Sequence, residues 1–149
     1  MDRKYNRFFV MLLISFVVMY MAMFLNVVAL GHVYLSLTRF YMALLMVAPM
    51  AIVMLIAMWG MYKNKKTNTI ILTVAIVVFV VALVFLRTQT PIGDEQYMKA
   101  MISHHSSAIL TSEEAAITDP EVRELADQII ATQKEEIAQM QEILERLES

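Results

Sequence analysis

The sequence predicts an all-α protein in which three transmembrane helices precede an acidic helical hairpin. Two observations carry this prediction. Residues 1–90 contain three long stretches without Asp, Glu, Lys or Arg, and residues 91–149 show apolar residues at helical spacing. The 149-residue chain is 59% hydrophobic with a mean hydropathy of +0.60, which is too apolar for an ordinary soluble domain of this length. We therefore assign residues 1–90 to a membrane region and residues 91–149 to a hairpin domain.

The three predicted spans cover residues 8–30, 40–62 and 69–86. Each is close to the ~20 residues needed to cross a hydrocarbon core about 30 Å thick. The first span is too long for the apolar part of a signal peptide and lacks a convincing cleavage site. We therefore expect it to be a retained signal anchor.

Basic residues predict the orientation of the spans. Arg3, Lys4 and Arg7 precede the first span, and the cluster at residues 63–66 separates the second from the third. Because loops rich in Lys and Arg stay in the cytoplasm, the N-terminus is predicted to be cytoplasmic. Three crossings then place residues 87–149 outside. The prediction is an integral protein of the cytoplasmic membrane, in contact with lipid, with a periplasmic or extracellular C-terminal domain.

Charge divides the two regions. Residues 1–90 hold eight basic residues and one acidic residue, a net charge of +7, whereas residues 91–149 hold four basic and thirteen acidic residues, a net charge of −9. The acidic region argues against a nucleic-acid partner and is compatible with attracting cations, although a solvated helix surface carries similar charge. The chain has no cysteine, which excludes disulfides and thiolate metal ligands.

Helix signals predict the hairpin. Residues 90–93, which include a proline and a glycine, break the chain after the third span. Asp94 can cap a first helix that runs to about Ala115. Residues 117–118 form a short turn, and Asp119 followed by Pro120 starts a second helix that runs to about Leu147. Two antiparallel helices joined in this way form a hairpin.

The helical faces place a histidine in an apolar stripe. At about 100° per residue, His105 lies near the centre of the apolar arc of the first helix and His104 lies at its edge. In the second helix, Gln133 lies at the centre of the arc and Glu136 on its flank. Counting back from the turn puts Met101 level with Gln133.

Imidazole and thioether groups in one layer favour a soft metal ion. The same pattern also arises from a core histidine bonded to Gln133 and from methionines that fill gaps. Both interpretations stay open at this point.

A sequence motif spans both helices. Met-Ile-x-His-His-x-x-Ala-Ile begins at Met101, and Asp-Pro-Glu-Val-Arg-x-Leu-Ala-x-x-Ile-Ile-x-x-Gln-x-x-Glu-Ile-x-x-Met runs from Asp119 to Met140. The pattern resembles domain-of-unknown-function family 305 over residues 94–147. The resemblance implies a bacterial, ferritin-like helical bundle, often periplasmic or anchored in a membrane, that in some members binds copper or silver ions. Carried over by motif, the candidate metal ligands are Met98, Met101, His104, His105 and Met140.

The chain also departs from the family pattern. Thr111 and Ser112 stand where many relatives carry Met or Met-Cys, and Ala126 stands where some carry Cys. Longer members build a four-helix bundle from two related halves, and this chain has one half. Because a single hairpin buries its two apolar stripes poorly, we expect a homodimer that completes the bundle.

Methionines recur every fourth residue of the second span, at Met42, Met46, Met50, Met54 and Met58. Ctr-type copper transporters also have three spans and a Met-x-x-x-Met motif in the second. A three-span transporter with a methionine-lined path is therefore an alternative function, and methionine as an ordinary apolar membrane residue is the other explanation.

Enzymatic activity is not predicted. A ferritin-like di-iron centre needs Glu-x-x-His motifs, and the residues three positions before the two histidines are Met101 and Ile102. The chain has neither a Gly-rich phosphate loop nor a His-Glu-x-x-His motif. Three functions remain open: a membrane-anchored module that handles Cu(I) or Ag(I), a structural or interaction protein that oligomerises without metal, and the transporter.

Overall fold

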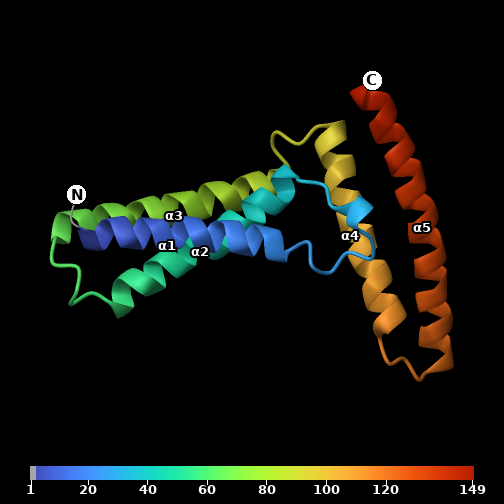
Figure 1. The fold of residues 1–149 in the computed structure, drawn as a ribbon, viewed down its shortest axis with the longest axis horizontal. Coiled ribbons are helices and arrows are strands. Elements are labelled where there is room, and N and C mark those ends of the chain that lie inside the picture. Colours follow the sequence, from blue (N-terminus) through green and yellow to red (C-terminus); the bar gives the residue numbers. More distant parts are fainter. Residues whose placement is uncertain (1–2) are drawn as a thin grey trace. The chain divides into compact units, whose positions relative to one another are not determined.

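Residues 3–149 are described by the computed structural model, and they are helical with no strand in that range (Figure 1). The helices are α1 (Arg3–Ala22), η1 (Leu30–His32), α2 (Leu37–Ala57), α3 (Lys65–Thr88), α4 (Asp94–Glu114) and α5 (Pro120–Glu148). The predicted all-α class is confirmed. The chain divides into a three-helix unit, which holds the residues up to Ala22 and Thr38–Pro91, and a hairpin unit, which holds Met23–Leu37 and Ile92–Ser149. We call Met23–Leu37 the connector.

The three-helix unit contains α1, α2 and α3, which are long and apolar enough to cross a membrane. The predicted first span is too long, because α1 ends at Ala22 and not at residue 30. Residues 23–30 leave the helix, and the Val28 backbone N–H there bonds to a side chain of α4 instead of a helical carbonyl. The third span is longer than predicted, and Asn64 caps its start by accepting a hydrogen bond from the Thr67 N–H at 3.1 Å.

A buried polar group ties the ends of these helices together. Asn68 is fully buried, and its Oδ1 accepts a hydrogen bond from the Tyr5 hydroxyl at 2.8 Å. Its Nδ2 donates to the Tyr62 carbonyl at 2.8 Å. The rings of Tyr5 and Phe8 lie against the ring of Tyr62, with centroids 5.1 and 5.6 Å away. Because Oδ1 and Nδ2 of Asn68 both have hydrogen-bond partners, the side chain is buried without an unpaired polar atom.

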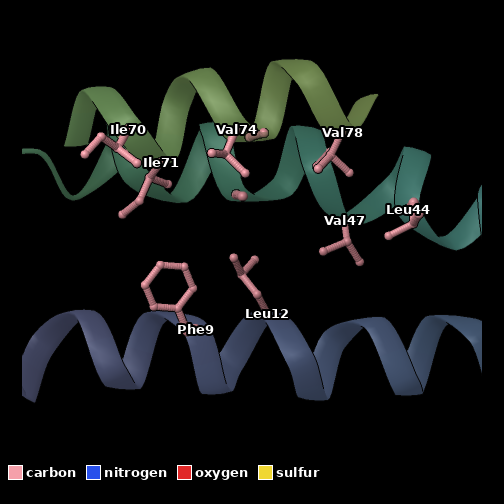
Figure 2. A pocket seen from close by; sticks show the side chains of 11 residues that line it. Phe9, Leu12, Leu44, Val47, Ile70, Ile71, Val74 and Val78 are labelled. Carbon is pink, nitrogen blue, oxygen red and sulfur yellow. The ribbon is translucent and has the colours of Figure 1, made fainter. Parts of the chain in front are cut away.

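A cavity of about 210 Å³ lies among α1, α2 and α3, and its lining is entirely apolar (Figure 2). Phe9 and Leu12 reach it from α1, Leu44 and Val47 from α2, and residues 70–78 from α3. None of the regularly spaced methionines of α2 lines it. Met42 and Met46 are exposed, whereas Met54 and Met58 pack against the core of the unit. The methionines are therefore divided between the surface and the core of the unit.

In the hairpin unit, α4 and α5 lie side by side and run antiparallel, as the sequence predicts (Figure 1). Gly93, and not Asp94, is the residue before α4, and it makes no side-chain cap. Asp119 caps α5 as predicted, since its Oδ1 accepts from the Val122 N–H at 3.0 Å. The buried core consists of Ile102 and Ile109 from α4 and Ile137 and Leu144 from α5.

Ion pairs join the two helices at both ends of the hairpin. The Lys99 ammonium bonds to Glu95 on its own helix and to Glu148 at the end of α5, the latter at 2.9 Å. Hydrogen bonds to Glu95 first, and then to Glu148, raise the pKa of Lys99 above its ordinary value. Glu113, near the end of α4, lies 2.8 Å from Lys134 in the middle of α5. These contacts agree with an antiparallel pairing that extends over the whole of α4.

The connector forms a third layer of the hairpin unit that the sequence analysis did not expect. Ser106 of α4 accepts a hydrogen bond from the Val28 N–H at 2.8 Å. Ser103 donates to the His32 carbonyl at 2.7 Å, and Gln96 accepts from the Leu37 N–H at 3.0 Å. Both serines are fully buried. The assignment of residues 23–37 to the membrane region therefore differs from the compact units of the structure.

Candidate functional site

A groove between α4 and α5 gathers four of the five predicted ligand residues. Met98, Met101 and His105 line it from α4, and Met140 lines it from α5. The remaining lining residues are Tyr97, Glu136, Gln139 and Ile143. The groove thus brings one imidazole and three thioethers to one place.

The His105 ring has a defined orientation in this groove. Its Nδ1 lies 3.0 Å from the carbonyl oxygen of Met101, one helical turn earlier. Its Nε2 lies 2.8 Å from Oε2 of Glu136 on α5. Both partners are hydrogen-bond acceptors, so each ring nitrogen of His105 has a partner to which an N–H can donate. The side chain of His105 is 12% exposed and that of Glu136 is 48% exposed, so the pair lies at the edge of the core.

His104 is separate from this group. Its side chain is exposed, and it does not line the groove. Its ring contacts the His105 ring edge-on with centroids 5.9 Å apart, because the two residues are neighbours in sequence. This arrangement agrees with the predicted difference between a histidine at the centre of the stripe and one at its edge.

The predicted register of the two helices is wrong. Met101 does not share its layer with Gln133, since Gln133 does not line the groove and Met140 does. The Gln133 side-chain oxygen is buried without a hydrogen-bond partner among residues 3–149, so the alternative of a His105–Gln133 bond is also not observed. Counting from a turn at residues 117–118 placed the pairing too close to the N-terminus of α5.

Glu136 is the site residue that sequence reasoning missed as a contact of His105. It lies on the flank of the apolar arc of α5, one turn before Met140. The correct register of α5 against α4 would have found it. Its carboxylate adds an oxygen donor to the imidazole and thioethers of the groove.

The nitrogen and oxygen donors of the described residues do not by themselves make up a set of metal ligands. Among residues 3–149, no group of three or more His, Asp or Glu side chains stands close enough together to hold a metal ion. A metal ion at the groove would therefore depend on the thioethers of Met98, Met101 and Met140.

A Ser–His pair occurs elsewhere in the hairpin unit. The Nδ1 of His32 in the connector lies 2.9 Å from Oγ of Ser106. Ser106 is fully buried and already accepts the Val28 N–H. Because a nucleophile has to reach its substrate, this serine holds the connector in place and does not form a catalytic pair.

Comparisons with known proteins agree with the sequence motif. The sequence profile described as "Domain of unknown function (DUF305)" matches residues 85–148. An uncharacterized protein of Acanthamoeba polyphaga mimivirus is 39% identical over 138 residues, which cover 91% of this chain and 89% of that protein. No solved structure matches the chain. The bacterial origin that the resemblance implies gains no support from this viral relative. The family match includes the whole groove and nearly all of α4 and α5, and the chain belongs to the DUF305 family.

Proposed function

We propose that the protein is a membrane-anchored module that handles Cu(I) or Ag(I) outside the cytoplasm, with no catalytic role. The observation that carries this proposal is the gathering of His105 with Met98, Met101 and Met140 in one groove. A neutral imidazole and uncharged thioethers are ligands that suit soft monovalent ions, whereas Mg²⁺ and Ca²⁺ prefer oxygen. The metal is the cargo of this site.

The hydrogen bond of His105 supports its role as a ligand. In metal sites, one ring nitrogen of a histidine ligand commonly donates to a carbonyl or carboxylate, which leaves the other nitrogen for the metal. Here Nδ1 faces the Met101 carbonyl and Nε2 faces the groove and Glu136. A metal ion held by Nε2 would replace the contact between His105 and Glu136.

Titration of the full chain in detergent with Ag(I), or with Cu(I) under reducing conditions, tests the site. The connector belongs to the hairpin unit, so the complete protein is the right sample. His105→Ala and Met101→Leu should each weaken binding by at least about tenfold, or 1.4 kcal/mol, because each removes a ligand. His104→Ala is the matched control, since this exposed neighbour should leave the affinity unchanged.

The two possible failures have different meanings. Unchanged affinity in His105→Ala and Met101→Leu, with helix content intact by circular dichroism, would place the metal elsewhere. Absence of binding by the unaltered protein would favour the structural function. One observation favours that second candidate, because both ring nitrogens of His105 have protein partners without a metal, the Met101 carbonyl and the Glu136 carboxylate. In that case Thr111 and Ser112 mark a family member without a metal site.

The arrangement of the hairpin unit supports three crossings of the membrane. The connector follows α1 and the hairpin follows α3, yet both belong to one compact unit and so lie on one side of a bilayer. This is expected when α2 and α3 both cross and return the chain to the same side. Together with the basic residues at the start of α1 and at residues 63–66, it favours an extracytoplasmic hairpin unit.

Reporter fusions in a bacterial host test this orientation. Alkaline phosphatase, which is active only outside the cytoplasm, should be active when fused after Ser149 and inactive when inserted at Lys65. The reverse pattern would place the groove in the cytoplasm. It would remove the case for an extracytoplasmic metal site while leaving the metal affinity itself untouched.

A further inference from the structure

The connector presents apolar side chains that the rest of the hairpin unit does not cover. Leu25 and Leu30 are 84% and 90% exposed. Val28, Val33 and Leu35 are exposed as well. A single exposed leucine needs no explanation, but five exposed apolar side chains in fifteen residues form a patch. The connector also contains no Asp, Glu, Lys or Arg.

Several backbone N–H and C=O groups of the connector have hydrogen-bond partners within the protein, as a lipid environment requires. Irregular backbone is excluded from lipid unless protein groups pair its amides and carbonyls. Here backbone groups of the connector form hydrogen bonds with three side chains of α4, those of Ser103, Ser106 and Gln96. Inside the connector, the N–H groups of His32 and Val33 bond to carbonyls in the turn of η1. The polar side of the connector thus faces α4, and its apolar side chains remain exposed.

The chain itself indicates what covers this patch. The connector joins α1 to α2, and both helices are long and apolar enough to cross a membrane. Both of its ends are therefore covalently attached to segments embedded in lipid. Lipid is the nearest apolar phase for Leu25, Leu30 and Leu35.

We propose that the connector is an interfacial membrane anchor. Leu25, Leu30 and Leu35 enter the interfacial layer of the bilayer, and the bonds from Ser103 and Ser106 hold the hairpin to the segment that is anchored. The contact is apolar and not electrostatic, because the connector itself carries no Asp, Glu, Lys or Arg. Its insertion therefore does not require anionic lipid and occurs in zwitterionic bilayers as well.

The absence of cysteine in the natural sequence allows a direct test. The full chain carrying Leu30→Cys is labelled with nitrobenzoxadiazole and reconstituted into phosphatidylcholine vesicles, with and without phosphatidylglycerol. Leu125→Cys is the matched control, because Leu125 is an exposed leucine of the same unit on α5. We expect the Leu30 label to show blue-shifted emission and loss of fluorescence with nitroxide-labelled lipids, in both kinds of vesicle. The Leu125 label should show neither effect.

Three results would overturn the proposal. Emission from the Leu30 label like that of the Leu125 label means that the connector faces water. Quenching confined to anionic vesicles means that charge, and not the apolar patch, makes the contact. Efficient oxidative cross-linking of Leu30→Cys between two copies, without quenching by labelled lipids, means that a second copy covers the patch.

Discussion

Replacement of Ile137 by aspartate in the full chain is expected to unfold the hairpin. Ile137 is 4% exposed and packs with Ile102, Ile109 and Leu144 in the core between α4 and α5. The substitution removes a buried apolar side chain and introduces a carboxylate into the apolar core between the two helices. Together these effects should cost more than about 4 kcal/mol, which is a large part of the stability of a small domain. Hydrogen exchange of the α4 and α5 amides in detergent measures the effect.

Two further variants separate the charge from the position. Ile137→Val keeps the site apolar and should cost only about 0.5–1.5 kcal/mol. Leu125→Asp places the same new charge on the same helix at a residue that is 56% exposed, and it should change stability by less than about 0.5 kcal/mol. Protected amides in Ile137→Asp would show that the core of the hairpin is not where the structure places it.

The homodimer expected from the sequence stays a prediction. Ile137 is buried within one chain, so its substitution would remove the fold together with any dimer and cannot test the contact between copies. The exposed residues Val122 and Leu147 on α5 are apolar positions that remain for a second copy. Sedimentation of the detergent-solubilised full chain should show a dimer that Val122→Asp weakens. A folded monomer in the unaltered protein would contradict the homodimer.

Local signals were enough to predict both helices of the hairpin. Asp119 and Pro120 mark the start of α5, and the break at residues 90–93 marks the start of α4 within one residue. Four of the residues that line the groove were predicted as ligands, because helical periodicity and the family motif select one face of each helix. These signals need no information from elsewhere in the chain.

Contacts distant in sequence account for what was missed. Residues 23–30 are apolar and compatible with a helix, so nothing local ends the first span at Ala22. The connector instead bonds to serines about 70 residues later. In the sequence, Ser103 and Ser106 look like polar residues beside an apolar stripe, and their burial follows only from the contact with the connector. The pairing of His105 with Glu136 was missed for a different reason, because it depends on the exact length of the turn.

Removal of both connector-binding hydroxyls should release the connector from α4. In the double variant Ser103→Ala, Ser106→Ala, the Val28 N–H and the His32 carbonyl lose their partners, and His32 Nδ1 loses its contact. An unpaired buried polar group costs about 1–3 kcal/mol, so the pair should cost roughly 2–5 kcal/mol in docking free energy. The two effects are coupled through His32 and need not add. Hydrogen exchange of the connector amides should become faster, while the amides of α5 stay protected.

A third serine of α4 provides the control for this experiment. Ser107 is adjacent to Ser106, but its hydroxyl bonds to the Ser103 carbonyl of its own helix at 3.0 Å. Ser107→Ala removes the same atoms without touching the connector, so exchange in the connector should stay slow. Slow exchange in the double variant as well would show that apolar contacts alone hold the connector. Fast exchange in both would show that α4 itself had been disturbed. Only release confined to the double variant shows that two buried hydroxyls join the segment between the first two spans to the helix that carries His105.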